Sequence, residues 1–411
     1  MLHLDGDTIV DQPEGRRENF VPLHTRDIVE MLASHSAVER LDAERGERDF
    51  RQIASLILAL LHHLYRQRHE QLTYIYAPLD PDRDRLLRTV PTPQYRGELV
   101  NELMERTQDA MHRANYHKLS PQDIHEAMAA ASRWGVRMRV NFAMLSKLEV
   151  YGRGHVIGQR EVRHWSNWFR QETVDVPLYQ RLVVVFRTAD DLKSTQFDSR
   201  RVYLRMFKNV PRQDIDMMLP ATGVQMSWLD HSKIVVPSLY AAGMALWRFL
   251  RNVMLLAFFG VFKTLAFCVL ICLAIGFGLK SMFTYRSNTQ RRYMLNMAQS
   301  LYYQNLDNNA GVLFRLLEEG EQQEANEAIL AYFVATFLLA DRSSLTLKEI
   351  DDACESLLRE ATEMEIDFDV ERTARMLLRL GIMCVDGDEW TSLEPRKAIA
   401  KLDETWDSWF T

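Results

Sequence analysis

The densest run of side chains that could bind a polar ligand is YYQNLDNN, at residues 302–309. Its tyrosines, asparagines and carboxylate can donate and accept hydrogen bonds, and Asp307 is the sole acid between residues 233 and 317. These residues favour a helix with a polar face and a local break, because asparagine favours caps and turns. The alternative is a polar site that faces a β region near Tyr151 and Arg153. The candidate polar site comprises Tyr151, Arg153, Tyr303, Asn305, Asp307, Asn308 and Asn309.

A basic stretch precedes this run along the chain. Arg286, Arg291 and Arg292 are candidate contacts for anionic lipid headgroups, because a cation near a membrane surface is attracted to them. Ordinary anchoring of membrane topology predicts the same residues. Asp307 is expected to pair with Arg291, Arg292 or Arg315.

Other residue types that often carry chemistry give no site. GRGHVIG at residues 152–158 has the glycines of a phosphate loop, but no strand–loop–helix unit surrounds it, so we predict a turn between two strands. His62, His63 and His69 lack the spacing of a zinc site. Cys354 stands in the acidic segment DDACESLL, which raises a thiol pKa and favours a structural role. No cofactor and no metal are expected.

Length and composition limit the classes of protein that remain. The chain has 411 residues, of which 47% are hydrophobic and 26% charged, so it can form two or three domains with real cores. Four cysteines exclude a disulfide-stapled secreted scaffold. The net charge of −6 hides an uneven distribution: 32 basic and 32 acidic residues up to 232, then 9 and 1 over 233–317, then 9 and 23 over 318–411.

The basic middle region contains two apolar runs. Residues 234–247 carry no charge, and residues 253–279 carry only Lys263. The second run would span about 40 Å as a helix, longer than a hydrocarbon core of about 30 Å. We predict a transmembrane helical hairpin that turns at Arg248 and Arg251, since burying these arginines in lipid is costly. A single span over the second run is the alternative.

The flanking regions predict an α+β fold: a helical N-terminal region, a small antiparallel β region, the transmembrane hairpin, and a helical C-terminal region ending in a winged-helix-like unit. Helical spacing of apolar residues is clear over 53–64, and alternating segments lie between 136 and 208. After the hairpin, helices are predicted over 289–317, 322–340, 346–363 and 369–380, followed by a β-hairpin turning at Asp386-Gly387 and a helix from Pro395. The predicted domains are a disordered tail 1–20, the helical region 21–134, the β region 135–220, the transmembrane hairpin 233–283 and the acidic region 284–411.

Three segments carry a family resemblance. KLEVYGRG at 147–154, VYLRMFKNVPRQDIDMMLP at 202–220 and LYYQNLDNNAGVLFRLLEEGEQQEANEAILAYF at 301–333 occur in one order around one hydrophobic region. Together they resemble a family of uncharacterised membrane proteins, a domain of unknown function, that includes the mitochondrial transmembrane protein 143. The resemblance spans residue 21 to the C-terminus. It implies two membrane spans and no established activity, and it supplies no catalytic residues.

These patterns predict an integral membrane protein that anchors interaction domains facing the cytoplasm. Its partners are then the lipid bilayer and proteins bound by the acidic C-terminal region, with a homo-oligomer as a further option and nucleic acid disfavoured by the charge. The alternative is a membrane-bound enzyme with a deep polar pocket between the β region and residues 302–309, so enzymatic activity is left open. An acidic N-terminus without an apolar stretch argues against a secretory signal, and we expect the bacterial inner membrane, or alternatively a mitochondrial membrane.

Overall fold

The computed structural model describes most of the chain outside the predicted membrane region. The described residues are 17–41, 45–83, 92–131, 137–163, 171–189, 197–220, 222–225, 303–342 and 344–409, together with Met244, Trp247 and Leu295. They form two compact units. Unit 1 comprises residues 1–119, 145–212 and 305–411, and unit 2 comprises residues 120–144 and 213–304. Helices combined with antiparallel strands confirm the α+β part of the predicted fold.

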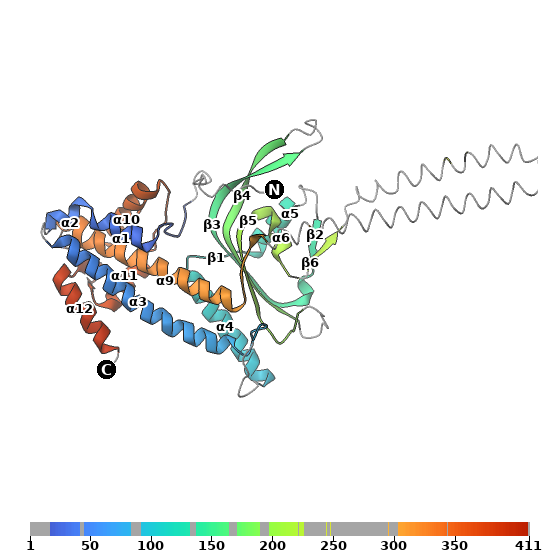
Figure 1. Ribbon diagram of the computed structural model, residues 1–411, viewed down its shortest axis with the longest axis horizontal. Helices are drawn as coiled ribbons and strands as arrows, with labels where there is room; N and C mark the ends of the chain where they lie inside the picture. Colours follow the sequence, from blue (N-terminus) through green and yellow to red (C-terminus); the bar gives the residue numbers. More distant parts are fainter. Residues whose placement is uncertain are drawn as a thin grey trace, which may run out of the picture. The chain divides into compact units, whose positions relative to one another are not determined.

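Unit 1 is built around one central helix. Helix α9 contacts helices from both ends of the sequence, namely α1, α3, α4 and α11, and it continues into a π-helical turn, Val334–Leu338 (Figure 1). The helices of this unit are α1 Thr25–Ala33, α2 Ser36–Leu41, α3 Gly46–Tyr76, α4 Pro93–Arg113, α9 Ala310–Phe333, α10 Leu347–Thr362, α11 Val370–Leu380 and α12 Pro395–Ser408.

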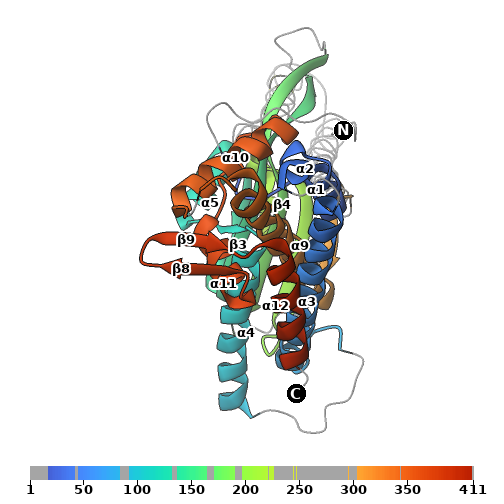
Figure 2. The same ribbon diagram turned by 90° about the vertical axis from the view of Figure 1, so that its left-hand side faces the viewer.

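The apolar core of unit 1 joins the N-terminal helices to the C-terminal ones. Phe50 of α3 packs edge-on against Phe333 and Phe337, with ring centroids 5.6 Å away in both cases. The same buried cluster includes Leu377 of α11 and Leu402 of α12, and α12 runs beside α3 (Figure 2). Segments predicted as separate helical regions therefore bury their apolar faces against each other.

Local signals in the sequence set the limits of the C-terminal elements. Thr346 and Glu349 form a reciprocal capping box at the start of α10. Gly381 ends α11 with φ +76°, and Gly387 turns the hairpin with φ +62°. The strands β8 Met383–Asp386 and β9 Glu389–Ser392 pair as predicted, and a bridge from Leu345 to Trp390 adds the short third strand of a winged-helix order.

A five-stranded antiparallel sheet completes unit 1. Its order is β1-β3-β4-β5-β7, and one face packs on helices, because Val183 and Leu204 share a buried cluster with Leu72, Leu103 and Leu316. The strands are β1 His117–Lys118, β3 Leu145–Arg163, β4 Gln171–Thr188, β5 Tyr203–Pro211 and β7 Asn305–Asn308. A 3-10 turn, Arg212–Asp214, follows β5.

Two predictions about this sheet are wrong. The glycine-rich segment 152–158 lies inside the long strand β3 and is not a turn. Its glycines serve close packing: a Cβ at Gly152 would lie 2.8 Å from the Tyr179 ring, and Gly154 has φ +72°. The helix predicted over 289–317 is also interrupted, since Asn305–Asn308 pairs with β5 as a strand.

Unit 2 contains short elements in its described part. They are α5 Pro121–Ala131, β2 Arg137–Val140, a 3-10 turn Phe142–Met144, α6 Ile215–Met218 and β6 Thr222–Gln225. Strands β2 and β6 pair antiparallel, and α6 contacts both α5 and β2. Ser120 caps α5, because its hydroxyl accepts a hydrogen bond from the Asp123 amide at 3.1 Å.

The predicted transmembrane hairpin is corrected. Among the described residues, no helix combines the length and the apolar composition needed to cross a bilayer. Residues 233–283, where the hairpin was predicted, lie outside the described residues except for Met244 and Trp247. The predictions of an integral membrane anchor and of a membrane-bound enzyme both depend on this hairpin, and the described residues do not support them.

Candidate functional site

The structure separates the two halves of the predicted polar site. Tyr151 and Arg153 lie on β3, whereas Asn305 to Asn308 form β7. Strands β4 and β5 stand between them in the sheet. Three strand spacings place β3 and β7 about 14 Å apart. The predicted lipid contacts Arg286, Arg291 and Arg292 lie outside the described residues.

The polar run after β7 makes local contacts. Asp307 forms an ion pair with Arg315, one of its three predicted partners. Asn309 has φ +50°, and its side-chain oxygen accepts a hydrogen bond from the Leu204 amide at 3.2 Å. The side-chain amide of Asn309 donates to Asp82. These contacts fix the start of α9 against the edge of the sheet, while Tyr303 is 68% exposed.

Tyr151 and Arg153 are committed to contacts within unit 1. The Tyr151 hydroxyl donates to Glu149 at 2.6 Å. Arg153 donates to the Ala114 carbonyl at 3.1 Å and forms an ion pair with Glu319 at 3.1 Å. Its guanidinium also lies over the Tyr116 ring, 4.8 Å from the centroid. Arg153 thus ties β3 to α4 and α9.

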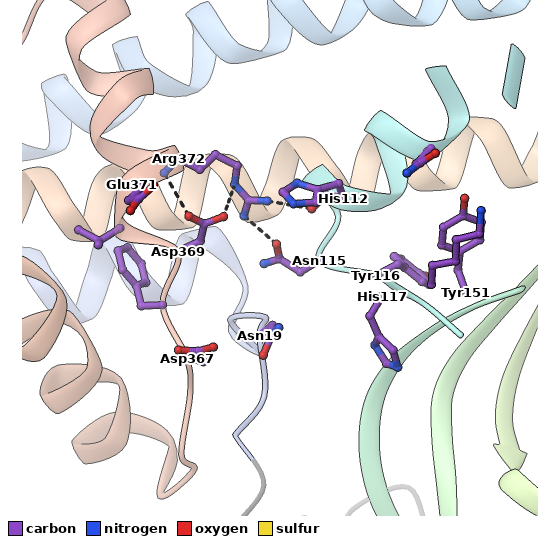
Figure 3. A pocket seen from close by; sticks show the side chains of 14 residues that line it. Asn19, His112, Asn115, Tyr116, His117, Tyr151, Asp367, Asp369, Glu371 and Arg372 are labelled. Carbon is purple, nitrogen blue, oxygen red and sulfur yellow. Dashed lines mark hydrogen bonds and ion pairs between the residues drawn. The ribbon is translucent and has the colours of Figure 1, made fainter. Parts of the chain in front are cut away.

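A different polar cavity opens beside Tyr151. It has a volume of about 570 Å³ and is walled by four segments that are distant in the sequence (Figure 3). These are the N-terminal segment at Asn19, the end of α4 with β1, strand β3 at Tyr151, and the turn that leads into α11 with its first residues. We call it the α11 cleft. Its lining residues are Asn19, Gln108, His112, Asn115, Tyr116, His117, Lys118, Tyr151, Asp367, Phe368, Asp369, Val370, Glu371 and Arg372.

Arg372 holds α11 in place beside the α11 cleft. Its guanidinium binds both carboxylate oxygens of Glu327 at 2.9 Å, the Asn115 side-chain oxygen at 2.7 Å and the His112 carbonyl at 2.8 Å. The Glu327 side chain is only 4% exposed. Burial raises the pKa of Glu327, and the charge of Arg372 opposes that rise. The pair therefore locks α11 to α9 and to the end of α4.

The two walls of the α11 cleft differ in charge. Asp367, Asp369 and Glu371 line the α11 side. The opposite wall carries His112, His117 and Lys118 from the end of α4 and from β1, and Figure 3 shows Asp367 and His117 on opposite sides. Within the described chain, the side chains of four lining residues make no hydrogen bond or ion pair; they are Asn19, Gln108, His112 and Asp367.

Residues 17–23, which we call the N-terminal strap, form one edge of the α11 cleft. The Glu18 amide donates to the Glu365 carbonyl at 2.9 Å, and the Asp367 amide donates to the Glu18 carbonyl at 2.8 Å. Val21 exchanges two hydrogen bonds with the Gln323 side chain. These bonds set Asn19 beside Asp367 without using either side chain.

The sequence did not predict the α11 cleft or the buried ion pair between Arg372 and Glu327. Glu327 is in a polar stretch of α9 that suggests a solvated helix face, but α9 is buried on all sides from Gln323 to Phe333. Arg372 has the spacing of an ordinary surface residue of α11. The prediction for Cys354 is confirmed, because this thiol is fully buried and burial raises its pKa. Across the described ranges, no cluster of three or more histidine, cysteine or acidic side chains is placed to hold a metal.

Comparison with known proteins gives a partial identification. Residues 179–311 match a family described as a protein of unknown function, DUF3754. The match runs from β4 to the start of α9 and confirms the prediction that the chain carries a domain of unknown function. No solved structure matches the chain.

Proposed function

We propose that unit 1 is a binding module for a small zwitterionic molecule, an amino acid or a short peptide, held in the α11 cleft. The observation that carries this proposal is one cavity lined by the acids Asp367 and Glu371 on one side and by Lys118 with two histidines on the other, with four polar side chains left uncommitted. A volume of about 570 Å³ falls within the range typical of small-molecule sites.

The charges suggest how such a ligand would lie. Its ammonium group would face Asp367 and Glu371, and its carboxylate would face Lys118 and His112. Lys118 is ion-paired with Glu149 at 2.5 Å, so a ligand carboxylate would share this cation with Glu149. Asn19 and Gln108 can hydrogen-bond to either end of the ligand. Arg372 is held by Glu327, Asn115 and the His112 carbonyl, so this side of the cavity would need little rearrangement on binding, which favours affinity.

Isothermal titration calorimetry on the full chain tests this proposal. We expect free amino acids or dipeptides to bind, and N-acetylated and C-amidated forms of the same compounds to bind at least about tenfold more weakly, since each loses one charge-assisted contact. Equal affinity for the blocked and the free forms would refute the zwitterion assignment.

Variants locate the site. Asp367→Asn removes one charge at constant size and should weaken binding of the ammonium end by about tenfold. Lys118→Met should weaken binding of the carboxylate end. Glu360→Gln, an exposed acid on α10 outside the cleft, is the matched control and should leave the affinity unchanged. Unaltered binding by a well-folded Asp367→Asn protein would rule out the α11 cleft.

A second candidate function is the binding of a basic protein partner by the acidic C-terminal region. The hairpin of β8 and β9 presents Asp386, Asp388 and Glu389 to solvent, together with Val385, which is 41% exposed. Apolar surface ringed by one sign of charge is typical of interaction sites. Reversing the three charges should abolish salt-sensitive capture of a basic partner, and capture that survives the reversal would exclude the hairpin.

The narrower resemblance to the group that includes mitochondrial transmembrane protein 143 stays a prediction, as does the predicted cellular location. The match over residues 179–311 is to a family of unknown function.

A further inference from the structure

A second cavity of about 270 Å³ lies between α3, α4 and α11 in unit 1. Its charged lining is dominated by cations: five arginines against two carboxylates. The arginines are Arg68, Arg113, Arg372, Arg375 and Arg379. We propose that this arginine cavity binds a small oxyanion, such as phosphate or a phosphate monoester, between Arg68 of α3 and the arginine pair Arg375 and Arg379 of α11.

Two of the five arginines are already neutralised. Arg113 binds Asp109 at 2.8 Å and the buried Glu324 at 2.6 Å. Arg372 is bound to Glu327, as described above. Neither has charge to spare for a ligand, and both serve as walls of the cavity.

The remaining three arginines keep donors for a ligand. Arg68 reaches Glu324 with a single nitrogen at 3.5 Å. Arg375 lies 3.6 Å from Glu371, and both side chains are about 70% exposed, so this ion pair is weak. Arg379 makes no hydrogen bond or ion pair with any described residue. Its positive charge is therefore the least compensated in the cavity.

The arrangement suits an oxyanion. Positions 372, 375, 376 and 379 recur at helical spacing, so Arg375 and Arg379 project from one face of α11 toward the cavity, with Arg68 on the opposite wall. Guanidinium groups bind phosphate through paired N–H donors. A bound oxyanion would bridge α3 to α11.

The position of α11 in the fold gives a second argument. The elements α10, α11, β8 and β9 follow a helix–helix–hairpin order. In nucleic-acid-binding proteins with this order, the second helix is the recognition helix, whose exposed face enters the DNA major groove. Helix α11 occupies that place here. Here the arginine face lies across a small cavity from α3 and α4. The region around α11 is also strongly acidic, with 23 acidic and 9 basic residues over 318–411, so it would repel the phosphate backbone of DNA. A small anion held between the arginines of α11 and Arg68 avoids that repulsion.

The test is calorimetric titration of the full chain with inorganic phosphate, compared with chloride at equal ionic strength. We expect saturable phosphate binding that Arg375→Gln combined with Arg379→Gln weakens by at least about tenfold, and that Arg68→Gln on the opposite wall also weakens. Arg396→Gln, an exposed arginine on α12 outside the cavity, is the control and should bind like the unaltered protein. None of these positions contributes to the apolar core.

A second measurement does not depend on variants. Phosphate should protect Arg379 from phenylglyoxal modification in the native protein, as read by mass spectrometry of its peptide. Equal heats with chloride, equal affinity in the double variant, or unprotected Arg379 would each overturn the proposal. Binding of a short DNA duplex that depends on Arg375 and Arg379 would also overturn it, because the face would then be open to nucleic acid.

Discussion

Replacing Arg372 by methionine should destabilise unit 1 strongly. The substitution keeps much of the apolar stem but removes the guanidinium that binds Glu327, Asn115 and the His112 carbonyl. Glu327 then stays buried with a weaker set of partners: Asn115 at 2.9 Å and Thr373 at 3.4 Å. Breaking a buried ion pair by removing one partner costs about 3–5 kcal/mol. We expect a loss near the lower end, about 3 kcal/mol, because Asn115 still donates to the carboxylate.

This loss should depend on pH. Burial already raises the pKa of Glu327, and Arg372 provides the main opposing influence. Without Arg372 that pKa rises further above its unfolded value. A carboxyl group whose folded pKa is raised favours folding at low pH, and this contribution is lost as the pH rises through the folded pKa. The cost of Arg372→Met should therefore shrink as the pH is lowered from 7 toward 4.

Urea unfolding of the single and double variants measures both effects. Arg372→Met combined with Glu327→Gln should recover part of the lost stability, since no buried charge remains without a partner. The reasoning would be refuted by a loss under about 1 kcal/mol at neutral pH, the value expected of a surface ion pair. A pH-independent loss would refute the assignment of the effect to Glu327.

Two further predictions concern other parts of unit 1. Burial and the charge of Glu355 raise the pKa of Asp351 to about 6, so ionised Asp351 opposes folding at neutral pH. Asp351→Asn should stabilise the protein by about 1 kcal/mol at pH 7, allowing for solvent screening of a partly exposed group, and this gain should decline in melting curves recorded down to pH 4. Gly154→Ala should lower the free energy of unfolding by about 1–3 kcal/mol, which is read as a lower melting temperature. The reason is that φ is +72° and the new Cβ would lie 2.6 Å from the Gln180 side-chain oxygen. Gly97→Ala in α4, where nothing lies within 4 Å, is its control and should be neutral or stabilising; equal effects at both glycines would contradict the strain argument.

Signals confined to a few neighbouring residues predicted local structure well. The apolar stripe of α3, the helix over 369–380 and the Asp386-Gly387 turn all correspond to what the structure contains. Each depends on backbone chemistry within one turn or on helical spacing, which a single sequence displays directly.

Features that depend on distant partners were not predictable. Asn305 to Asn308 form a strand because β5 offers an edge to pair with, and nothing within the segment specifies that edge. Gly152 and Gly154 have the sequence signature of a turn, yet they permit close packing of β4 against β3. The α11 cleft escaped prediction because its walls come from four segments that meet only in the folded chain.

The shared core of unit 1 also has a consequence for synthesis on the ribosome. Phe50 and its neighbours on α3 are buried against α9, and the same core is closed by side chains as late in the chain as Leu402. The apolar faces of α1 and α3 therefore cannot pack against α9 until more than two hundred further residues have been made. Contacts of such long sequence separation fold slowly, and chains with exposed apolar surface aggregate. Nascent or truncated chains that end before α12 are expected to need chaperone protection, and this need should end once α12 packs against α3.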